Sequence, residues 1–115
     1  MVSESIAELK ERLQLFLNEH NTLTIATRNA QSIWAATVFY IADAEMNLYF
    51  LSSDRARHIQ DIESHNEVAV TIYQDVSDWQ SIQGVQATGH VSHVGEDKKS
   101  SVINQYTSKY VFLKE

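Results

Sequence analysis

Short runs of strand-forming residues follow one another along this chain of 115 residues, and only one helix-like segment lies between them. Five runs are rich in β-branched and aromatic residues and are bounded by polar turns. They are residues 22–28, 33–41, 46–51, 68–73 and 84–94. Parallel strands need a long crossover between each pair, and one helical segment cannot supply four of them. We therefore predict a single domain over residues 1–115, mainly β, built around a small antiparallel barrel.

The run over residues 33–41 (IWAATVFYI) is apolar at both its odd and its even positions. Alternate side chains of a strand point to opposite faces, so both faces should be covered. We expect Trp34 in the core and a helix, a ligand or a second subunit over the outer face. In the run over residues 84–94, Gly89 predicts a bend or bulge of the kind that barrels use at corners.

Both ends of the chain have helical patterns. Ser5 followed by Glu8 fits a capping box, and the helix after it should end near residues 18–21. Its apolar stripe, expected to pack on the sheet, is Ile6, Leu9, Leu13 and Phe16. A second helix is expected after Gly95, and its inner residues are Val102, Ile103 and Tyr106.

Composition and charge exclude several classes of protein. The chain has no Cys, which rules out disulfide scaffolds, Cys-based zinc sites and a catalytic thiol. A net charge of −6 disfavours nucleic acid as a partner. No run approaches the roughly 20 apolar residues of a membrane span, and the N-terminus lacks a basic start followed by an apolar run. We expect a cytoplasmic protein with no membrane association.

Few residues suggest catalysis or metal binding. His90 and His93 are three apart on a predicted strand, so they should point to opposite faces and cannot easily share a metal ion. No nucleophile elbow, Walker A motif or GxGxxG motif is present. Asp61 and Glu63 are interpreted as charges on a helix surface. No residue is assigned as a nucleophile, general acid or general base.

Residues 51–58 (LSSDRARH) are the most informative segment for function. They place two hydroxyls, two guanidiniums and an imidazole where a strand gives way to the short internal helix, in which Ile59 and Ile62 face inward. A helix N-terminus offers free N–H groups and a partial positive charge, and Arg suits phosphate oxygens. The segment predicts phosphate binding. An ordinary capped surface helix with solvated charges is the alternative.

Three patches, WAATVFYI (34–41), LYFLSSDRARHIQDIESHNEVAV (48–70) and GVQATGHV (84–91), resemble the pyridoxamine 5′-phosphate oxidase-like family of FMN-binding split barrels. The similarity covers about residues 10–110 and is greatest to small uncharacterised bacterial members. It implies a small antiparallel split β-barrel of about six strands with flanking helices. It also implies a homodimer with two FMN molecules in clefts at the subunit interface.

The resemblance assigns site residues in this numbering. The second strand would run beside the flavin ring and contact it through Ala36, Thr37, Val38 and Phe39. The phosphate would be held by a hydroxyl after the third strand and by a basic pair at the start of the short helix. These positions correspond to Ser52, with Ser53 beside it, and to Arg57 and His58. The polar face of the late strand makes Gln86 a further cofactor-binding candidate.

The sequence departs from the oxidase members of the family. They carry Arg-Lys where this chain has Arg57-His58, and Arg and Lys where it has Ala36 and Ile41. Their C-terminal strand has no counterpart before the chain ends, so we expect the domain to lack it. We therefore do not expect pyridoxamine 5′-phosphate oxidase activity.

Several functions are compatible with these features. The first is an FMN-binding protein that acts as a flavin-dependent oxidoreductase on an unknown substrate. The second is a cofactor-free dimeric scaffold that binds a partner. The third is a haem-binding split barrel in which His58, His90 or His93 is a ligand. A deazaflavin is a further alternative cofactor.

Overall fold

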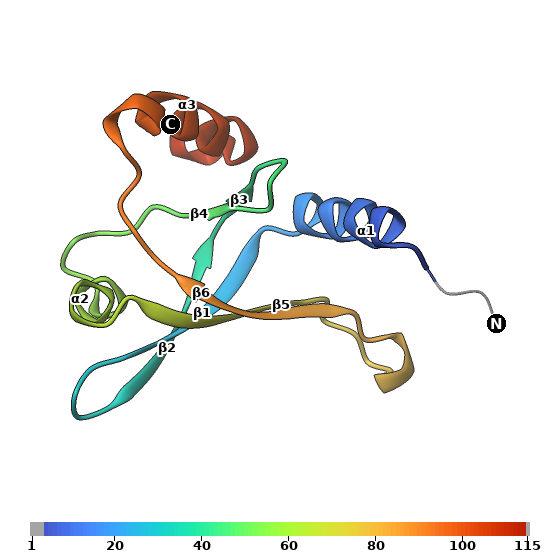
Figure 1. Ribbon diagram of the computed structural model, residues 1–115, viewed down its shortest axis with the longest axis horizontal. Helices are drawn as coiled ribbons and strands as arrows, with labels where there is room; N and C mark the ends of the chain where they lie inside the picture. The colour runs from blue at the N-terminus through green and yellow to red at the C-terminus, as the bar shows by residue number, and fades with distance from the viewer. Residues whose placement is uncertain (1–3, 115) are drawn as a thin grey trace.

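The computed structural model describes residues 4–114, which form three α-helices and six strands (Figure 1). In chain order the elements are α1 (Ile6–Glu19), β1 (Thr22–Arg28), β2 (Ile33–Phe39), β3 (Ile41–Ala42), β4 (Leu48–Tyr49), α2 (Arg57–Ser64), β5 (Glu67–Tyr73), the 3-10 turn η1 (Trp79–Ser81), β6 (Gly84–His90), α3 (Glu96–Lys109) and the 3-10 turn η2 (Val111–Lys114). The helices contain about as many residues as the strands do. The fold is therefore α+β, which corrects the expectation of a mainly β protein.

The strands form two antiparallel sheets, as a split barrel requires. The larger sheet has the order β2-β1-β5-β6, and the smaller one pairs β3 with β4. Strand β1 is central, because it pairs with β2 along its whole length and with β5 between Thr24 and Ala26. The β3–β4 pair, α1 and α3 all lie toward one side of the larger sheet (Figure 1).

The strand predicted over residues 33–41 is divided at Tyr40. Strand β2 ends at Phe39, and β3 begins at Ile41 in the other sheet. Tyr40 is completely buried between them, and its hydroxyl donates a hydrogen bond to the carbonyl oxygen of Leu17 at 2.7 Å. The chain therefore crosses from one sheet to the other at a residue that is fixed by α1.

The bulge expected at Gly89 is not present in the ladder between β5 and β6. Residues pair one to one from Tyr73 opposite Gly84 to Glu67 opposite His90, and Gly89 lies opposite Val68. The strand also ends at His90, earlier than the alternating pattern over residues 84–94 suggested.

The core lies between the inner face of the larger sheet, α1 and α2. Its buried members are Leu17, Leu23, Ile25, Val38, Tyr40, Ile62, Val68 and Ile72. Helix α1 begins at the predicted cap, where the Glu8 N–H donates to the Ser5 hydroxyl at 3.1 Å. Its predicted inner stripe is only half correct, since Ile6 and Leu9 are exposed where the first turns project beyond the sheet (Figure 1).

A second, smaller cluster lies under α3 and contains Ile41, Tyr106 and Tyr110. Tyr106 is buried and Val102 packs against the cluster, as the sequence predicted. Ile103 is exposed, contrary to the prediction. The last turn of α3 therefore fastens the β2–β3 crossing close to the C-terminal end of α1.

Candidate functional site

The outer face of the larger sheet carries small side chains in two central rows. Cross-strand pairing places Ala35, Ala26, Ala69 and Thr88 in one row, and Thr37, Thr24, Thr71 and Gln86 in the next. Larger or charged residues flank these rows, with Ile33, Arg28, Glu67 and His90 at one end and Phe39, Thr22 and Tyr73 at the other. Most of these residues are exposed, and within residues 4–114 the contact that partly covers this face is that of Tyr110 and Phe112 with Phe39.

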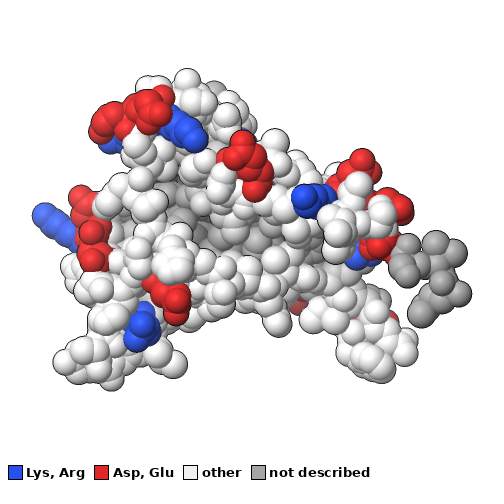
Figure 2. All heavy atoms as spheres, in the orientation of Figure 1, with Lys and Arg blue, Asp and Glu red and all other residues white. Residues whose placement is uncertain are grey.

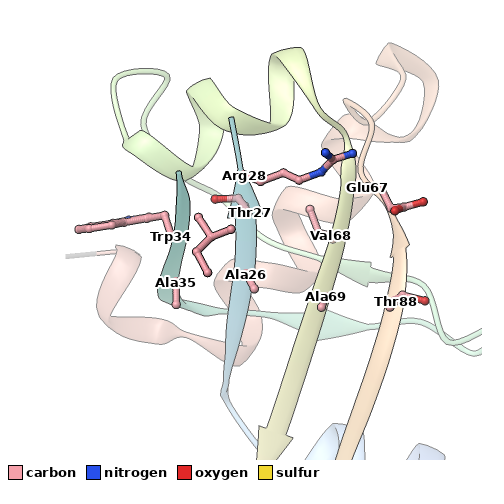
Figure 3. A pocket seen from close by; sticks show the side chains of 10 residues that line it. Ala26, Thr27, Arg28, Trp34, Ala35, Glu67, Val68, Ala69 and Thr88 are labelled. Carbon is pink, nitrogen blue, oxygen red and sulfur yellow. The ribbon is translucent and has the colours of Figure 1, made fainter. Parts of the chain in front are cut away.

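A broad, open hollow of about 580 Å³ occupies one end of this face (Figure 3). Its lining residues are Ala26, Thr27, Arg28, Ile33, Trp34, Ala35, Glu67, Val68, Ala69 and Thr88. The three alanines give it a low apolar floor, while the Arg28 side chain extends toward Glu67 and Trp34 extends to the opposite side (Figure 3). A smaller hollow of about 200 Å³ lies at the other end, among Thr22, Thr24, Thr37, Thr71, Tyr73 and Asp75.

The start of α2 places Ser52 and His58 in direct contact. The Ser52 hydroxyl and His58 Nε2 are 2.8 Å apart, and the imidazole is half-buried. Burial lowers the pKa of His58, and the nearby Asp61 carboxylate partly opposes that shift. Burial therefore favours the neutral imidazole, and an anion bound beside it would favour the protonated form.

Arg57, the neighbouring residue, reaches the β1–β2 hairpin. Its Nη2 donates to the Ser32 hydroxyl at 2.6 Å, and its guanidinium carbon lies 4.2 Å from the centre of the Trp34 ring. Trp34 was expected in the core but is 44% exposed, since β2 is an edge strand of the larger sheet. It carries the guanidinium of Arg57 and lines the hollow. Trp34 therefore connects the hollow to the basic start of α2.

The prediction that Asp61 is a surface charge is wrong. It is 4% exposed instead of lying on the helix surface. Its carboxylate accepts hydrogen bonds from the Thr27 hydroxyl at 2.9 Å and from the Asn29 amide at 3.2 Å. These partners lie more than 30 residues away in sequence, so no local pattern could have identified them. The network fastens α2 to β1 and to the turn that follows it.

The other predicted site residues lie in three places. Ser53 shapes the turn before α2, since its hydroxyl accepts from the Arg55 N–H at 3.2 Å. Ala36 and Val38 are on the inner face of β2, where Val38 is buried in the core. Thr37, Phe39 and Gln86 are on the outer face. The side chains predicted along residues 36–39 thus divide between two faces, and Val38 can meet a ligand only through its backbone.

Two histidines that were considered as ligands contact glutamates. His93 Nε2 lies 2.8 Å from Glu63, and His90 Nε2 lies 3.8 Å from Glu67. Within residues 4–114, no three or more His, Asp or Glu side chains gather closely enough to hold a metal ion. None of the helices in that range has the length and apolar character needed to cross a membrane.

The family model described as pyridoxamine 5′-phosphate oxidase matches residues 9–114, nearly the whole chain. The chain belongs to the pyridoxamine 5′-phosphate oxidase family. This confirms the family resemblance stated for the sequence. Among curated relatives, a UPF0306 protein of Yersinia pestis is 25% identical over 100 residues, which cover 86% of this chain and 68% of that protein.

Solved structures of this family type share the fold. A protein of unknown function from Agrobacterium tumefaciens matches with a TM-score of 0.82 at 16% identity, over 99% of this chain and 51% of that one. This chain thus spans about half of that protein. HutZ from Vibrio cholerae, described as a haem storage protein, matches with a TM-score of 0.76 at 22% identity, over 89% of this chain and 75% of HutZ. These matches establish the split-barrel fold.

Proposed function

We propose that this protein is a homodimer that binds FMN, and that it acts as a flavin-dependent oxidoreductase on an unidentified substrate. The observation that carries the proposal is the set of donors at the start of α2, namely Ser52, Arg57 and His58, in a chain of net charge −6. A concentration of cationic donors in an acidic protein favours an anionic ligand over a solvated surface.

The donors suit a phosphate monoester. Arg57 supplies planar N–H groups, Ser52 supplies a hydroxyl, and His58 can gain a proton as the anion binds. The N-cap residue of α2, Ala56, makes no side-chain hydrogen bond, so the first-turn N–H groups are not capped from that position. Each of these groups stabilises negative charge.

The hollow beside Trp34 suits a planar ring. Its floor of Ala26, Ala35 and Ala69 is apolar and carries no bulky side chain, so an aromatic ring can approach the sheet closely. Thr37 and Gln86, on the same face in the next row, offer polar groups to the edge of a ring. A bound FMN would supply hydride or electron transfer at its ring, while the chain holds its phosphate and limits access of water.

A second copy of the chain would pack on this exposed outer face of the larger sheet. The outer face exposes Ile33, Phe39 and Tyr73, and η2 exposes Val111, Phe112 and Leu113 nearby, where Phe112 packs against Phe39. Exposed apolar residues gathered on one face typically mark a protein interface. In the view of Figure 2, charged side chains gather over α1, α3 and the α2 end of the molecule.

An absorption spectrum tests the cofactor assignment. The purified full-length chain is measured before and after incubation with FMN and desalting. Flavin bands near one FMN per chain support the proposal. A protein that stays colourless after FMN addition points to a partner-binding scaffold, and a Soret band in the purified protein points to haem. Incubation with a deazaflavin in parallel distinguishes the two flavin-type cofactors.

A further inference from the structure

A continuous chain of hydrogen bonds joins a buried carboxylate to the exposed guanidinium of Arg57. The Asp61 carboxylate accepts from the side-chain amide N–H of Asn29 at 3.2 Å. The Ser32 hydroxyl donates to the side-chain oxygen of Asn29 at 3.4 Å and accepts from Arg57 at 2.6 Å. The two ends of the chain are on α2, and its middle is the turn between β1 and β2. The helix and the turn therefore hold each other at two points.

The buried end of this chain is rigid. A carboxylate removed from water is tolerated only when its oxygens are hydrogen-bonded. In Asp61 one oxygen accepts from Asn29 and the other from Thr27. Thr27 is itself 3% exposed and belongs to the central strand of the sheet. Any movement of α2 along β1 would leave the charge unpaired.

The turn itself is organised by the same asparagine. The Asn29 side-chain oxygen accepts from the N–H groups of Gln31 at 2.8 Å and Ser32 at 2.9 Å, an Asx-type turn. The amide nitrogen of that side chain is the donor to Asp61. One residue thus sets the position of Ser32 relative to the buried carboxylate.

Arg57 receives both of its contacts from this hairpin. The guanidinium donates one of its five N–H groups to the Ser32 hydroxyl, and it lies over the ring of Trp34. The Trp34 ring that carries this guanidinium also lines the hollow, so Arg57 is connected to the hollow through Trp34. We infer that Ser32, Asn29 and Asp61 are positioning residues that hold Arg57 on Trp34 in the orientation that receives an anionic group. This inference rests on the proposed phosphate site.

The test is a double-mutant cycle on FMN affinity, measured by titration of the full-length protein. Ser32→Ala removes the acceptor of Arg57 at an exposed position, so it should leave the fold intact. We expect it to weaken FMN binding about fivefold, the effect of one net hydrogen bond. In a background of Arg57→Ala, the same change should have no further effect, because nothing remains to be positioned. Arg55→Ala is the control for loss of charge in the same segment.

Trp34 gives an independent readout that needs no bound cofactor. Trp79→Phe removes the second tryptophan, which is 81% exposed in η1. Trp34 is then the single tryptophan, and the tryptophan fluorescence reports on its surroundings alone. In that background, both Ser32→Ala and Asp61→Asn should shift the Trp34 emission toward that of Arg57→Ala. Far-UV circular dichroism establishes that each variant is folded.

The outcomes separate this inference from the proposed function. If Arg57→Ala weakens FMN binding but Ser32→Ala changes neither the affinity nor the Trp34 emission, the positioning inference is overturned and the phosphate site stands. If Arg57→Ala leaves FMN affinity unchanged, Arg57 is not in the phosphate site, and the inference fails with it. Additive losses in the two single variants likewise overturn the positioning role.

Discussion

At the scale of single residues, the start of α2 combines two basic groups in different states. Arg57 is exposed and always charged, and its guanidinium is held by Ser32 and Trp34. His58 is half-buried against Ser52, and burial keeps its pKa below the ordinary range. The first supplies a fixed charge to a ligand, whereas the second supplies a charge that depends on pH.

Arg57→Ala should weaken FMN binding by about 1.5–3 kcal/mol, the cost of losing a charged hydrogen bond to phosphate. The effect is measured by fluorescence titration of FMN. Arg55→Ala is the matched control, because Arg55 carries the same charge in the preceding turn and its hydrogen bonds with Ser53 and Gln60 both use its backbone. Equal losses in the two variants would show a general effect of charge and remove Arg57 from the site.

FMN affinity should fall as the pH rises from about 6 to 8, because the bound phosphate stabilises protonated His58 and a rising pH removes that proton. The phosphate itself gains charge near pH 6, which acts in the opposite direction. His58→Asn isolates the imidazole, since it keeps a neutral donor and does not titrate. The wild type should lose up to about tenfold more affinity than the variant over this interval. Parallel curves for the two proteins would exclude a role for the proton of His58.

At the scale of elements, the last turn of α3 acts as a clamp on the crossing between the sheets. Tyr106 donates to the carbonyl oxygen of Phe39 at 2.9 Å. The Tyr110 hydroxyl, which has one proton, lies within hydrogen-bond distance of two carbonyl oxygens, those of Asn21 at 2.8 Å and of Tyr40. Lys109 donates to the carbonyl of His20 at 2.5 Å and lies over the rings of Tyr40 and Tyr110. Three side chains of one helical turn thus bond backbone oxygens where α1, β1, β2 and β3 meet.

This clamp should make the protein sensitive to alkali. Burial raises the pKa of both Tyr40 and Tyr110 to about 12, whereas the same groups ionise near 10 when unfolded. The folded state therefore holds more protons between pH 10 and 12, and its stability falls over that interval by up to roughly 3 kcal/mol per tyrosine. Burial lowers the pKa of Lys109, so just below pH 10.5 the folded state holds fewer protons at this group than the unfolded state does. Lys109 therefore makes the stability rise with pH in that interval, opposite to the tyrosines.

Urea unfolding at pH 8 and at pH 11, in wild type and Tyr110→Phe, measures the effect of the clamp. The variant should be less stable at pH 8 by about 1–3 kcal/mol, because the carbonyl groups of Asn21 and Tyr40 lose the hydroxyl donor that they share. It should also lose less stability between the two pH values than the wild type does. Ser108→Ala, at an exposed position of the same turn, is the control. An equal loss in wild type and Tyr110→Phe would contradict the assignment to Tyr110.

Local periodicity predicted most elements but not where they end or what they cover. Alternation gave the faces of β6 correctly, since Gln86 and Thr88 share the outer face. The division at Tyr40 depends on a hydroxyl bond to Leu17, 23 residues earlier, which no local pattern contains. In the same way, the composition of residues 51–58 predicts a phosphate site there, which stays a prediction, whereas the burial of Asp61 depends on Thr27 and Asn29 in another element.

At the scale of the whole molecule, the larger sheet has a core on one face and an open outer face on the other. Its central alanines and threonines are small, so a second sheet face can approach closely, while Ile33 and Phe39 add apolar contact at either end. A two-fold dimer brings the same patch of both subunits together, which suits a face with small residues at its centre. The hollow beside Trp34 would then become a cleft between subunits.

A charge placed in the middle of this face should separate the subunits. Ala69 is exposed in the central row on β5, so Ala69→Glu should fold as the wild type does. We expect a dimer for the wild type and a monomer for the variant in size-exclusion chromatography with light scattering, because a dimer would bury unpaired carboxylates. FMN retention should be lost as well, because Ala69 belongs to the floor of the hollow that is proposed to hold the ring. Leu15→Glu, at an exposed apolar position on α1, is the control and should remain a dimer. A monomeric wild type, or an Ala69→Glu variant that dimerises as tightly as the wild type, would place the subunit interface elsewhere or exclude it.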